Sequence, residues 1–259
     1  MSTPLTLEFE HGLAILTFTN PARGNALDLA MARAFAAAIE QIGSRKDVRA
    51  LLITAQGKQF CVGGDLNSMA DASRPLTDTL RELLEPAHVA MAMIAMFRFP
   101  IVCAINGAVG GGGIGLALCG DLVLAAQSAK LRGGYSAIGL TPDVGGSWFV
   151  TRRAGAARAK EIFLTNRPFS AEECLRIGLF DAVHPDAELH DAARKLALQL
   201  ASGPAEAQAR IKSLISYAHH HTLEQHLDAE RESMYASGDS DDGREGVRAF
   251  IEKRAPRFG

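Results

Sequence analysis

Short apolar runs and longer amphipathic segments alternate along the N-terminal part of the chain. Residues 5–9 and 13–19 are apolar or alternating on either side of His11-Gly12, which predicts a β-hairpin. An alanine-rich amphipathic segment follows, with Asp28 as its N-terminal cap. Residues 48–55 are again mostly apolar, which is typical of a buried strand. Strand, helix and strand in this order predict a layered α/β fold with parallel strands.

The same alternation continues towards the middle of the chain. Residues 77–97 form a long, largely apolar segment that predicts a helix. Residues 101–105 and 122–126 are short apolar runs, each bounded by turn-forming residues, and both predict buried strands. We therefore expect further strand-helix-strand units in the same core.

After Gly146 the hydrophobic pattern becomes helical almost throughout. The clearest interruption is Gly203-Pro204, so we expect a core domain over residues 1–203 and a C-terminal helical region over residues 204–259. Because the second region has no strands of its own, it should pack on the core or on another subunit. The predicted helical segments are 147–154, 157–164, 171–177, 187–201, 205–217, 223–235 and 243–254.

Composition narrows the class of protein. The 259 residues are 47% hydrophobic, which is enough for one large core. The net charge is −2 and the basic residues are scattered, so nucleic acid is not an expected partner. No apolar run reaches membrane-spanning length and the first residues lack the pattern of a signal peptide. With four widely separated cysteines and no C-x-x-C pair, we expect reduced thiols, no membrane contact and a cytoplasmic location.

The histidine run His219-His220-His221, with His226 nearby, suggests a metal site at first sight. Adjacent residues on a helix point about 100° apart, so three consecutive imidazoles cannot converge on one ion. We interpret the run as a polar helix end and expect no metal.

A run of four glycines carries the strongest chemical signal. Gly110 to Gly113 follow the strand at 101–105 and precede an apolar helical segment at 114–119. Glycines before a helix let its free N–H groups approach an anion or a polarised oxygen. Gly110, Gly112 and Gly115 also match the dinucleotide pattern G-x-G-x-x-G, but no acidic residue follows between 122 and 142 to hold a ribose. Tight helix packing remains an alternative use for one or two of these glycines.

Two further loops combine glycine with a carboxylate. Gly63-Gly64-Asp65 follows a short apolar run, and Thr141-Pro142-Asp143-Val144-Gly145-Gly146 precedes a predicted helix. Asp143 could be a base in a site or the N-terminal cap of that helix, and both interpretations fit the sequence. Together the loops could supply an oxyanion site and a base.

Several motifs in order resemble the crotonase family, also called the enoyl-CoA hydratase/isomerase superfamily. The resemblance rests on residues 23–27, 60–66, 105–113, 119–121, 139–146 and 250–254, and so extends over nearly the whole chain. It implies a fold of repeated ββα units forming roughly perpendicular sheets, with a C-terminal helical region that mediates trimers or dimers of trimers. It also implies an acyl-CoA substrate, of which coenzyme A is a part, and no separate cofactor.

The resemblance assigns roles to particular residues. Backbone N–H groups of Gly64 and Gly112 are expected to hold an enolate oxygen of the thioester. Asp65 and Asp121 are expected to support loop folding as well. The coenzyme A moiety is expected at Arg23, Ala26, Leu27, Val62, Gly64, Asp65, Leu66 and Lys253, and the Lys253 contact could cross a subunit interface. The acyl pocket is expected at Met69, Gly115, Tyr135 and Leu140, with residues 71–86 shaping it.

The sequence departs from the hydratases of the family at two positions. Their two glutamates, which activate water, correspond here to Gly115 and Tyr135, and neither residue is a general base at neutral pH. Asp143 matches the acid of family members that move double bonds, especially the ring isomerases of phenylacetyl-CoA catabolism. The resemblance thus favours an isomerase in which Asp143 transfers a proton through a thioester enolate. A hydratase and a CoA-ester-binding protein with little catalysis remain alternatives, and Tyr135 is either a pocket group or a core aromatic.

Overall fold

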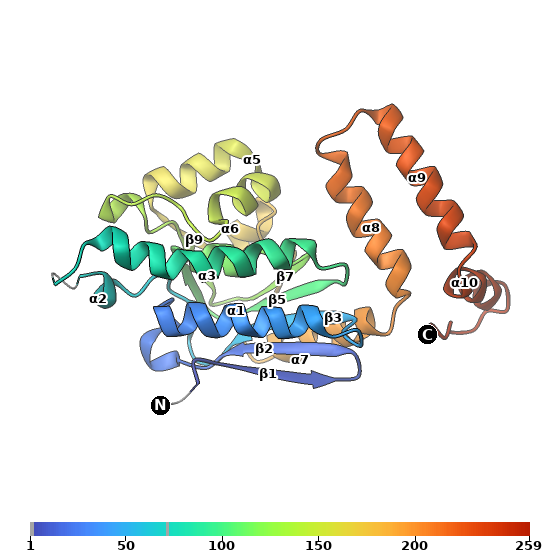
Figure 1. Cartoon of the computed structure of the whole chain (residues 1–259), viewed down its shortest axis with the longest axis horizontal. Helices are drawn as coiled ribbons and strands as arrows, with labels where there is room; N and C mark the ends of the chain where they lie inside the picture. The colour runs from blue at the N-terminus through green and yellow to red at the C-terminus, as the bar shows by residue number, and fades with distance from the viewer. Residues whose placement is uncertain (1–2, 71–72) are drawn as a thin grey trace.

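The computed structural model describes residues 3–70 and 73–259, and their strands form two sheets (Figure 1). The larger sheet consists, in spatial order, of β1 (Leu5–Glu10), β2 (Leu13–Phe18), β3 (Ala50–Ala55), β5 (Ile101–Ile105), β7 (Leu122–Ala126) and β10 (Ala182–His184). The smaller sheet consists of β4 (Gln59–Cys61), β6 (Ala108–Gly110), β8 (Lys130–Arg132) and β9 (Pro168–Ser170). Among the strand pairs of the described residues, only β1–β2 and β8–β9 are antiparallel, so the predicted hairpin and parallel strands are confirmed.

Successive strands divide between the two sheets. In the pairs β3–β4, β5–β6 and β7–β8, the first strand joins the larger sheet and the second joins the smaller one. Each pair leads into helical structure, and these repeats are the expected ββα units. The helical segments are α2 (Leu66–Met69) and α3 (Leu76–Met96), then α4 (Gly113–Leu118), and finally η2 (Ser136–Ile138) and α5 (Gly146–Thr165).

Helices cover both faces of the larger sheet. Every residue of β3 is buried, and its side chains alternate between two apolar clusters. Leu51 and Ile53 pack with residues of α1 (Leu29–Ser44) and α3, whereas Ala50 and Leu52 pack with α7 (Leu189–Ala201). A strand covered on both faces consists of a continuous run of mostly apolar residues, so β3 could be predicted from the sequence. None of the helices within the described ranges is both long and apolar enough to cross a membrane.

The long helices lie close to their predicted positions. Asp28 caps α1 by accepting a hydrogen bond of 2.9 Å from the Met31 amide. The two segments predicted at 147–154 and 157–164 are one helix, α5, broken at Gly155, where φ is 80° and ψ is 164°. Strands β4, β6, β8, β9 and β10 escape a sequence-based assignment because three residues are too few to show a period of two.

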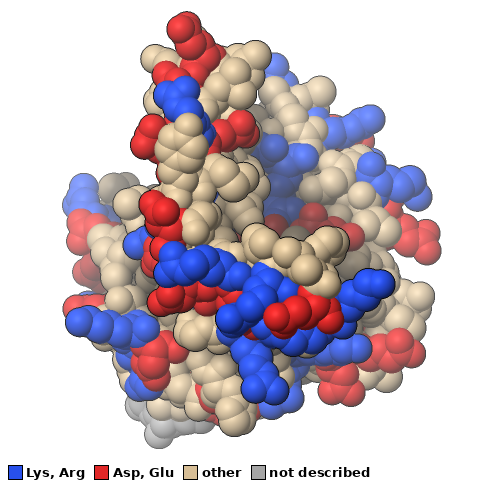
Figure 2. All heavy atoms as spheres, turned by 90° about the vertical axis from the view of Figure 1, so that its right-hand side faces the viewer, with Lys and Arg blue, Asp and Glu red and all other residues tan. Residues whose placement is uncertain are grey.

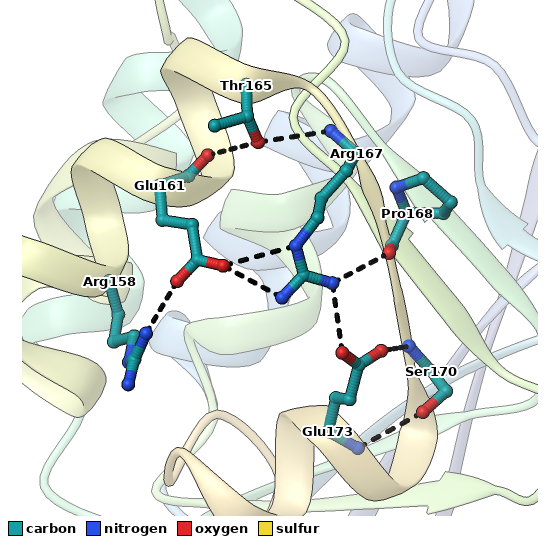
Figure 3. A network of polar contacts seen from close by, with 7 residues as sticks. All are labelled: Arg158, Glu161, Thr165, Arg167, Pro168, Ser170 and Glu173. Atoms are coloured by element: carbon teal, nitrogen blue, oxygen red, sulfur yellow. Dashed lines mark hydrogen bonds and ion pairs between the residues drawn. The ribbon is translucent and has the colours of Figure 1, made fainter.

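An ionic network joins the end of α5 to α6 (Ala171–Arg176) (Figure 3). The Arg167 guanidinium donates to Glu161 at 2.8 Å and to Glu173 at 2.9 Å, and it lies 3.6 Å above the ring of Phe169. Glu173 also completes the predicted capping box with Ser170. These contacts hold β9 between the two helices at the edge of the smaller sheet.

Three helices follow the break at Gly203-Pro204 and extend away from the sheets (Figure 1). They are α8 (Ala205–Ala218), α9 (Leu223–Gly238) and α10 (Asp241–Ile251). Lys212 attaches α8 to the core through an ion pair of 2.7 Å with Asp121. Figure 2 shows basic and acidic side chains intermixed on this side of the molecule. Large apolar side chains are also exposed on the three helices, namely Ile211, Ile215, Leu223, Leu227, Met234, Tyr235, Val247, Phe250 and Ile251.

Candidate active site

Two glycine loops meet backbone to backbone at the edge of the smaller sheet. A Cβ atom on Gly63 would lie 2.8 Å from the carbonyl oxygen of Gly110, and one on Gly113 would lie 2.3 Å from that of Cys61. Gly63 also has φ of 95°, a conformation that side chains disfavour. Glycine is therefore required for the close approach of the loops after β4 and β6. This contact brings the two predicted oxyanion loops together.

The amides of Gly64 and Gly112 have no partner within the described part of the chain. Gly64 lies between two backbone hydrogen bonds to Leu27, from Leu27 N–H to the Gly63 carbonyl (2.8 Å) and from Asp65 N–H to the Leu27 carbonyl (3.0 Å). Gly112 is the N-terminal cap of α4. In residues 3–70 and 73–259, neither amide donates a hydrogen bond. Both N–H groups are thus free to donate to an oxygen of a bound molecule.

The carboxylate of Asp143 lies beside the second of these loops. A Cβ atom on Gly112 would be 2.9 Å from Asp143 Oδ1. The buried Tyr135 hydroxyl donates to the same oxygen, and the Asp143 amide donates to the Tyr135 hydroxyl at 3.2 Å. Tyr135 is therefore a hydrogen-bond donor to Asp143 and a buried aromatic residue of the core at the same time.

The interpretation of Asp143 as a helix cap is wrong. Helix α5 begins at Gly146 with Gly145 as its cap, and no side chain of the described residues caps it. Instead, the Asp143 carboxylate is held within the site by Tyr135. Burial raises the pKa of Asp143 because the charged form loses hydration, and this outweighs the opposing effect of the Tyr135 hydrogen bond. Burial and the charge of Asp143 also raise the pKa of Tyr135, which therefore stays protonated as a donor.

Removing the Tyr135 hydroxyl should raise the pKa of Asp143 further. In the Tyr135→Phe variant the buried ring remains, but the hydrogen bond that favours the carboxylate is lost. A ¹³C NMR titration of the Asp143 carboxyl group should show its midpoint at higher pH than in the wild type. Tyr235→Phe, which changes an exposed tyrosine, serves as the control. A midpoint that stays in place or moves to lower pH would contradict a stabilising role for Tyr135.

Arg23, Leu27, Asp65 and Met69 line one cavity of about 550 Å³ between the starts of α1, α2 and α3. Arg23, at the end of η1 (Pro21–Arg23), pairs with Asp28 at 3.0 Å and with Asp65. Asp65 accepts hydrogen bonds from the Asn67 and Ser68 amides and so caps α2. Although burial opposes ionisation of Asp65, the Ser68 hydrogen bond and the Arg23 charge lower its pKa. The Asp65 side chain is thus used within the fold, as expected, and its backbone is used as well, because its amide donates to the Leu27 carbonyl and its carbonyl accepts from the Met69 amide at 3.2 Å.

The other residues expected to bind coenzyme A divide into near and distant ones. Ala26 is buried beside Leu27, whereas Val62, directly after β4, and Leu66, the first residue of α2, are exposed by 41% and 54%. Lys253 follows α10, which lies at the opposite end of the molecule from α2 (Figure 1). Within one chain, Lys253 therefore does not join the other predicted residues.

Four residues were expected to form the acyl pocket. Tyr135 holds Asp143, and the methyl group of Met69 covers Gly64, since a Cβ there would lie 2.4 Å from Met69 Cε. Leu140 is half-buried and packs on the core. A Cβ on Gly115 would lie only 1.8 Å from the Val144 carbonyl oxygen, so Gly115 serves the packing of α4 rather than presenting a wall to a ligand.

The segment 71–86 was expected to shape this pocket. Residues 71 and 72 lie outside the described residues. Thr79, Glu82 and Leu83 of α3 line the same cavity as Met69. The described part of the chain holds no group of three or more His, Cys, Asp or Glu side chains arranged for a metal ion.

Sequence reasoning missed His88. Its Nε2 atom accepts a hydrogen bond of 3.1 Å from the Val144 amide, directly after Asp143. His88 and Val144 are 56 positions apart, and a single histidine within an amphipathic helix has no distinguishing pattern. Only the fold could reveal this contact.

Comparison with known proteins agrees with the fold and the loops. Residues 8–259 match the family model described as enoyl-CoA hydratase/isomerase. The chain is 38% identical over 250 residues to the 1,2-epoxyphenylacetyl-CoA isomerase of Escherichia coli, covering 96% of this chain and 95% of the relative. It is also 38% identical over 251 residues to a "probable enoyl-CoA hydratase" of Rhodobacter capsulatus, with 97% and 96% covered.

A solved structure shows the same architecture. The crystal structure of an enoyl-CoA hydratase from Polaromonas sp. JS666 superposes with a TM-score of 0.91 at 32% identity, covering 98% of this chain and 99% of that one. The match includes the C-terminal helices, because nearly all of both chains is covered. From its loops, its fold and these similarities, the chain belongs to the enoyl-CoA hydratase/isomerase family and has the crotonase fold.

Proposed function

We propose that the protein is an acyl-CoA double-bond isomerase in which Asp143 is the catalytic base. The observation that carries the proposal is the position of the Asp143 carboxylate, half-buried next to Gly112 and held by Tyr135. The two positions that hold glutamates in hydratases are Gly115 and Tyr135 in this chain. A proton-transfer role for one carboxylate fits this site better than the activation of water by two.

The proposed reaction transfers one proton and adds no atoms. Asp143 removes a proton from the α-carbon of a 3-enoyl thioester, and the electron pair moves onto the carbonyl oxygen. The Gly64 and Gly112 amides stabilise this enolate oxygen, and each such donor typically contributes about 3–4 kcal/mol in a dry site. Asp143 then returns the proton to the γ-carbon, and the double bond comes into conjugation with the thioester. The reaction needs no other cofactor, because coenzyme A is part of the substrate.

The relatives support two substrate classes for this chemistry. Similarity to 1,2-epoxyphenylacetyl-CoA isomerase favours a thioester of an aromatic acid, and the family as a whole favours fatty-acyl thioesters. We therefore propose a place in fatty-acid or phenylacetate-type catabolism. The cavity beside Met69 and Leu83 would receive the acyl-CoA.

Hydration of a 2-enoyl-CoA is the second candidate function. It is favoured by the equal identity to the "probable enoyl-CoA hydratase" of Rhodobacter capsulatus. In that reaction Asp143, in place of the two glutamates, would activate the water molecule.

An assay in deuterated water separates the two functions. Purified protein receives a 3-enoyl-CoA in one sample and a 2-enoyl-CoA in another, followed by absorbance and mass spectrometry. Conjugation of the 3-enoyl-CoA without added water supports the isomerase. Formation of a 3-hydroxyacyl-CoA supports the hydratase, and binding with neither reaction nor α-proton exchange would contradict both.

We also propose that the chain forms a homotrimer or a dimer of trimers. The exposed apolar side chains of α8, α9 and α10 support this assembly, because such patches on soluble proteins commonly mark interfaces. Lys253 would then reach the coenzyme A bound to a neighbouring subunit. Light scattering should give the mass of three or six chains, and a monomeric mass would contradict the proposal.

A further inference from the structure

Val144, the residue after the proposed base, has an unfavourable backbone conformation. Its φ is 48°, in the left-handed region that β-branched residues rarely adopt, and Gly145 follows with φ of 77°. A conformation of this kind typically costs about 1–3 kcal/mol and persists only where the surroundings enforce it. Contacts on several sides must therefore hold this part of the loop.

Three contacts enclose Val144. Its amide donates to His88 Nε2 on α3 at 3.1 Å. Its carbonyl oxygen lies against the Cα of Gly115, where a Cβ would be 1.8 Å away, and its side chain lies against Gly112. The contact to His88 is the one hydrogen bond among them.

The two peptide units that flank the Asp143 Cα are therefore each held by a side chain from elsewhere in the fold. The Asp143 amide donates to the Tyr135 hydroxyl, and the Val144 amide donates to His88. Fixing the backbone on both sides of a residue fixes the direction of its Cα–Cβ bond. The position of the carboxylate beside Gly112 thus depends on both contacts.

The direction of the second hydrogen bond determines the state of the imidazole. An amide N–H can only donate, so Nε2 must accept with its lone pair. The ring is then neutral and carries its proton on Nδ1. Only this form of histidine can make the contact that the structure contains.

We propose that His88 is a positioning residue for Asp143, acting as a neutral acceptor that fixes the Val144 peptide. This inference rests on the proposed function, since Asp143 matters as the base of the isomerase. His88 does not touch the reacting atoms, and its effect passes through the loop. Misplacement of a catalytic group by about 1 Å can reduce a rate about a hundredfold.

Three substitutions of His88 test the proposal, because they either keep the hydrogen-bond acceptor at the same distance from Cα, shorten that distance or remove the acceptor. In His88→Gln the amide oxygen lies as many bonds from Cα as Nε2 does, so this variant should retain most of the isomerase activity. His88→Asn has an acceptor one bond too short, and His88→Leu has none. Both should lose about 10- to 100-fold in kcat, with KM for the CoA ester unchanged. Val89→Ala, which changes the exposed neighbour on α3, controls for effects on the helix and should match the wild type.

Equal kcat values for the Gln, Asn and Leu variants would overturn the proposal, as would a rise in KM alone. Crystal structures provide a second readout that does not depend on turnover. Val144 and the Asp143 carboxylate should keep their places in His88→Gln and shift in His88→Leu. An unmoved loop in His88→Leu would also overturn it. If the wild type does not isomerise a 3-enoyl-CoA but the loop of His88→Leu shifts as expected, the proposed function is wrong and the positioning role of His88 is still supported.

Discussion

The Asp143→Asn variant is expected to isomerise a 3-enoyl-CoA about a hundredfold to ten-thousandfold more slowly than the wild type. Asparagine has nearly the same shape and can still accept a hydrogen bond from Tyr135, so the loop should stay folded. Its amide cannot accept a proton at neutral pH. Binding of the CoA ester should persist, because the Gly64 and Gly112 amides and the cavity at Arg23 are unchanged.

Rates measured by absorbance and binding measured by calorimetry test this expectation together. Asp186→Asn is a matched carboxylate-to-amide control, since Asp186 is exposed and its carboxylate accepts a hydrogen bond from the Ser128 amide. A variant that keeps wild-type turnover would remove Asp143 from the mechanism. Loss of binding and folding together would instead assign Asp143 a structural role.

The pH dependence of the wild-type rate also tests the role of Asp143 as the base. Burial raises the pKa of Asp143, and the base acts only as the carboxylate. The rate should therefore be low at acid pH and rise through a pKa above the ordinary range of aspartate. The residual activity of Asp143→Asn should not show this rise with pH.

Sequence reasoning located the long elements of the fold well for a physical reason. Residues of β3 are buried on both faces, and α1 and α3 each extend over several turns, so their apolar patterns repeat often enough to be recognised. The smaller sheet consists of three-residue strands that show no period. Their positions depend on the contacts between the glycine loops, which form only in the folded chain.

In the candidate site, too, some features could be predicted from the sequence and others depend on contacts that form only in the folded chain. Gly64, Gly112 and Asp143 stand in loops with distinctive composition, and the resemblance to a family added their roles. The contact between Tyr135 and Asp143, and that between His88 and Val144, depend on the path of the chain through space. A tyrosine or histidine by itself does not indicate its partner.

Introducing a glutamate at Gly115 is expected to destabilise the protein and create no hydratase. The Cβ atom would lie 1.8 Å from the Val144 carbonyl oxygen, so the backbone of the loop would have to move. Overpacking a core commonly costs about 1–3 kcal/mol, and we expect the upper end here because the clash is with backbone. For a protein of this size, about 3 kcal/mol corresponds to a fall in Tm of roughly 6–12 °C.

The same movement should abolish the isomerase. Val144 is directly bonded to Asp143, so a displaced Val144 carbonyl would take the proposed base away from Gly112. Thermal unfolding and both enoyl-CoA assays would measure the effects of Gly115→Glu. Gly146→Ala is a matched control in the same contact, because its Cβ would lie 3.7 Å from Ile114, an ordinary packing distance. A stable Gly115→Glu variant that hydrates a 2-enoyl-CoA would mean that the loop moves easily, and that the fixed position of Val144 is not what separates this site from a hydratase.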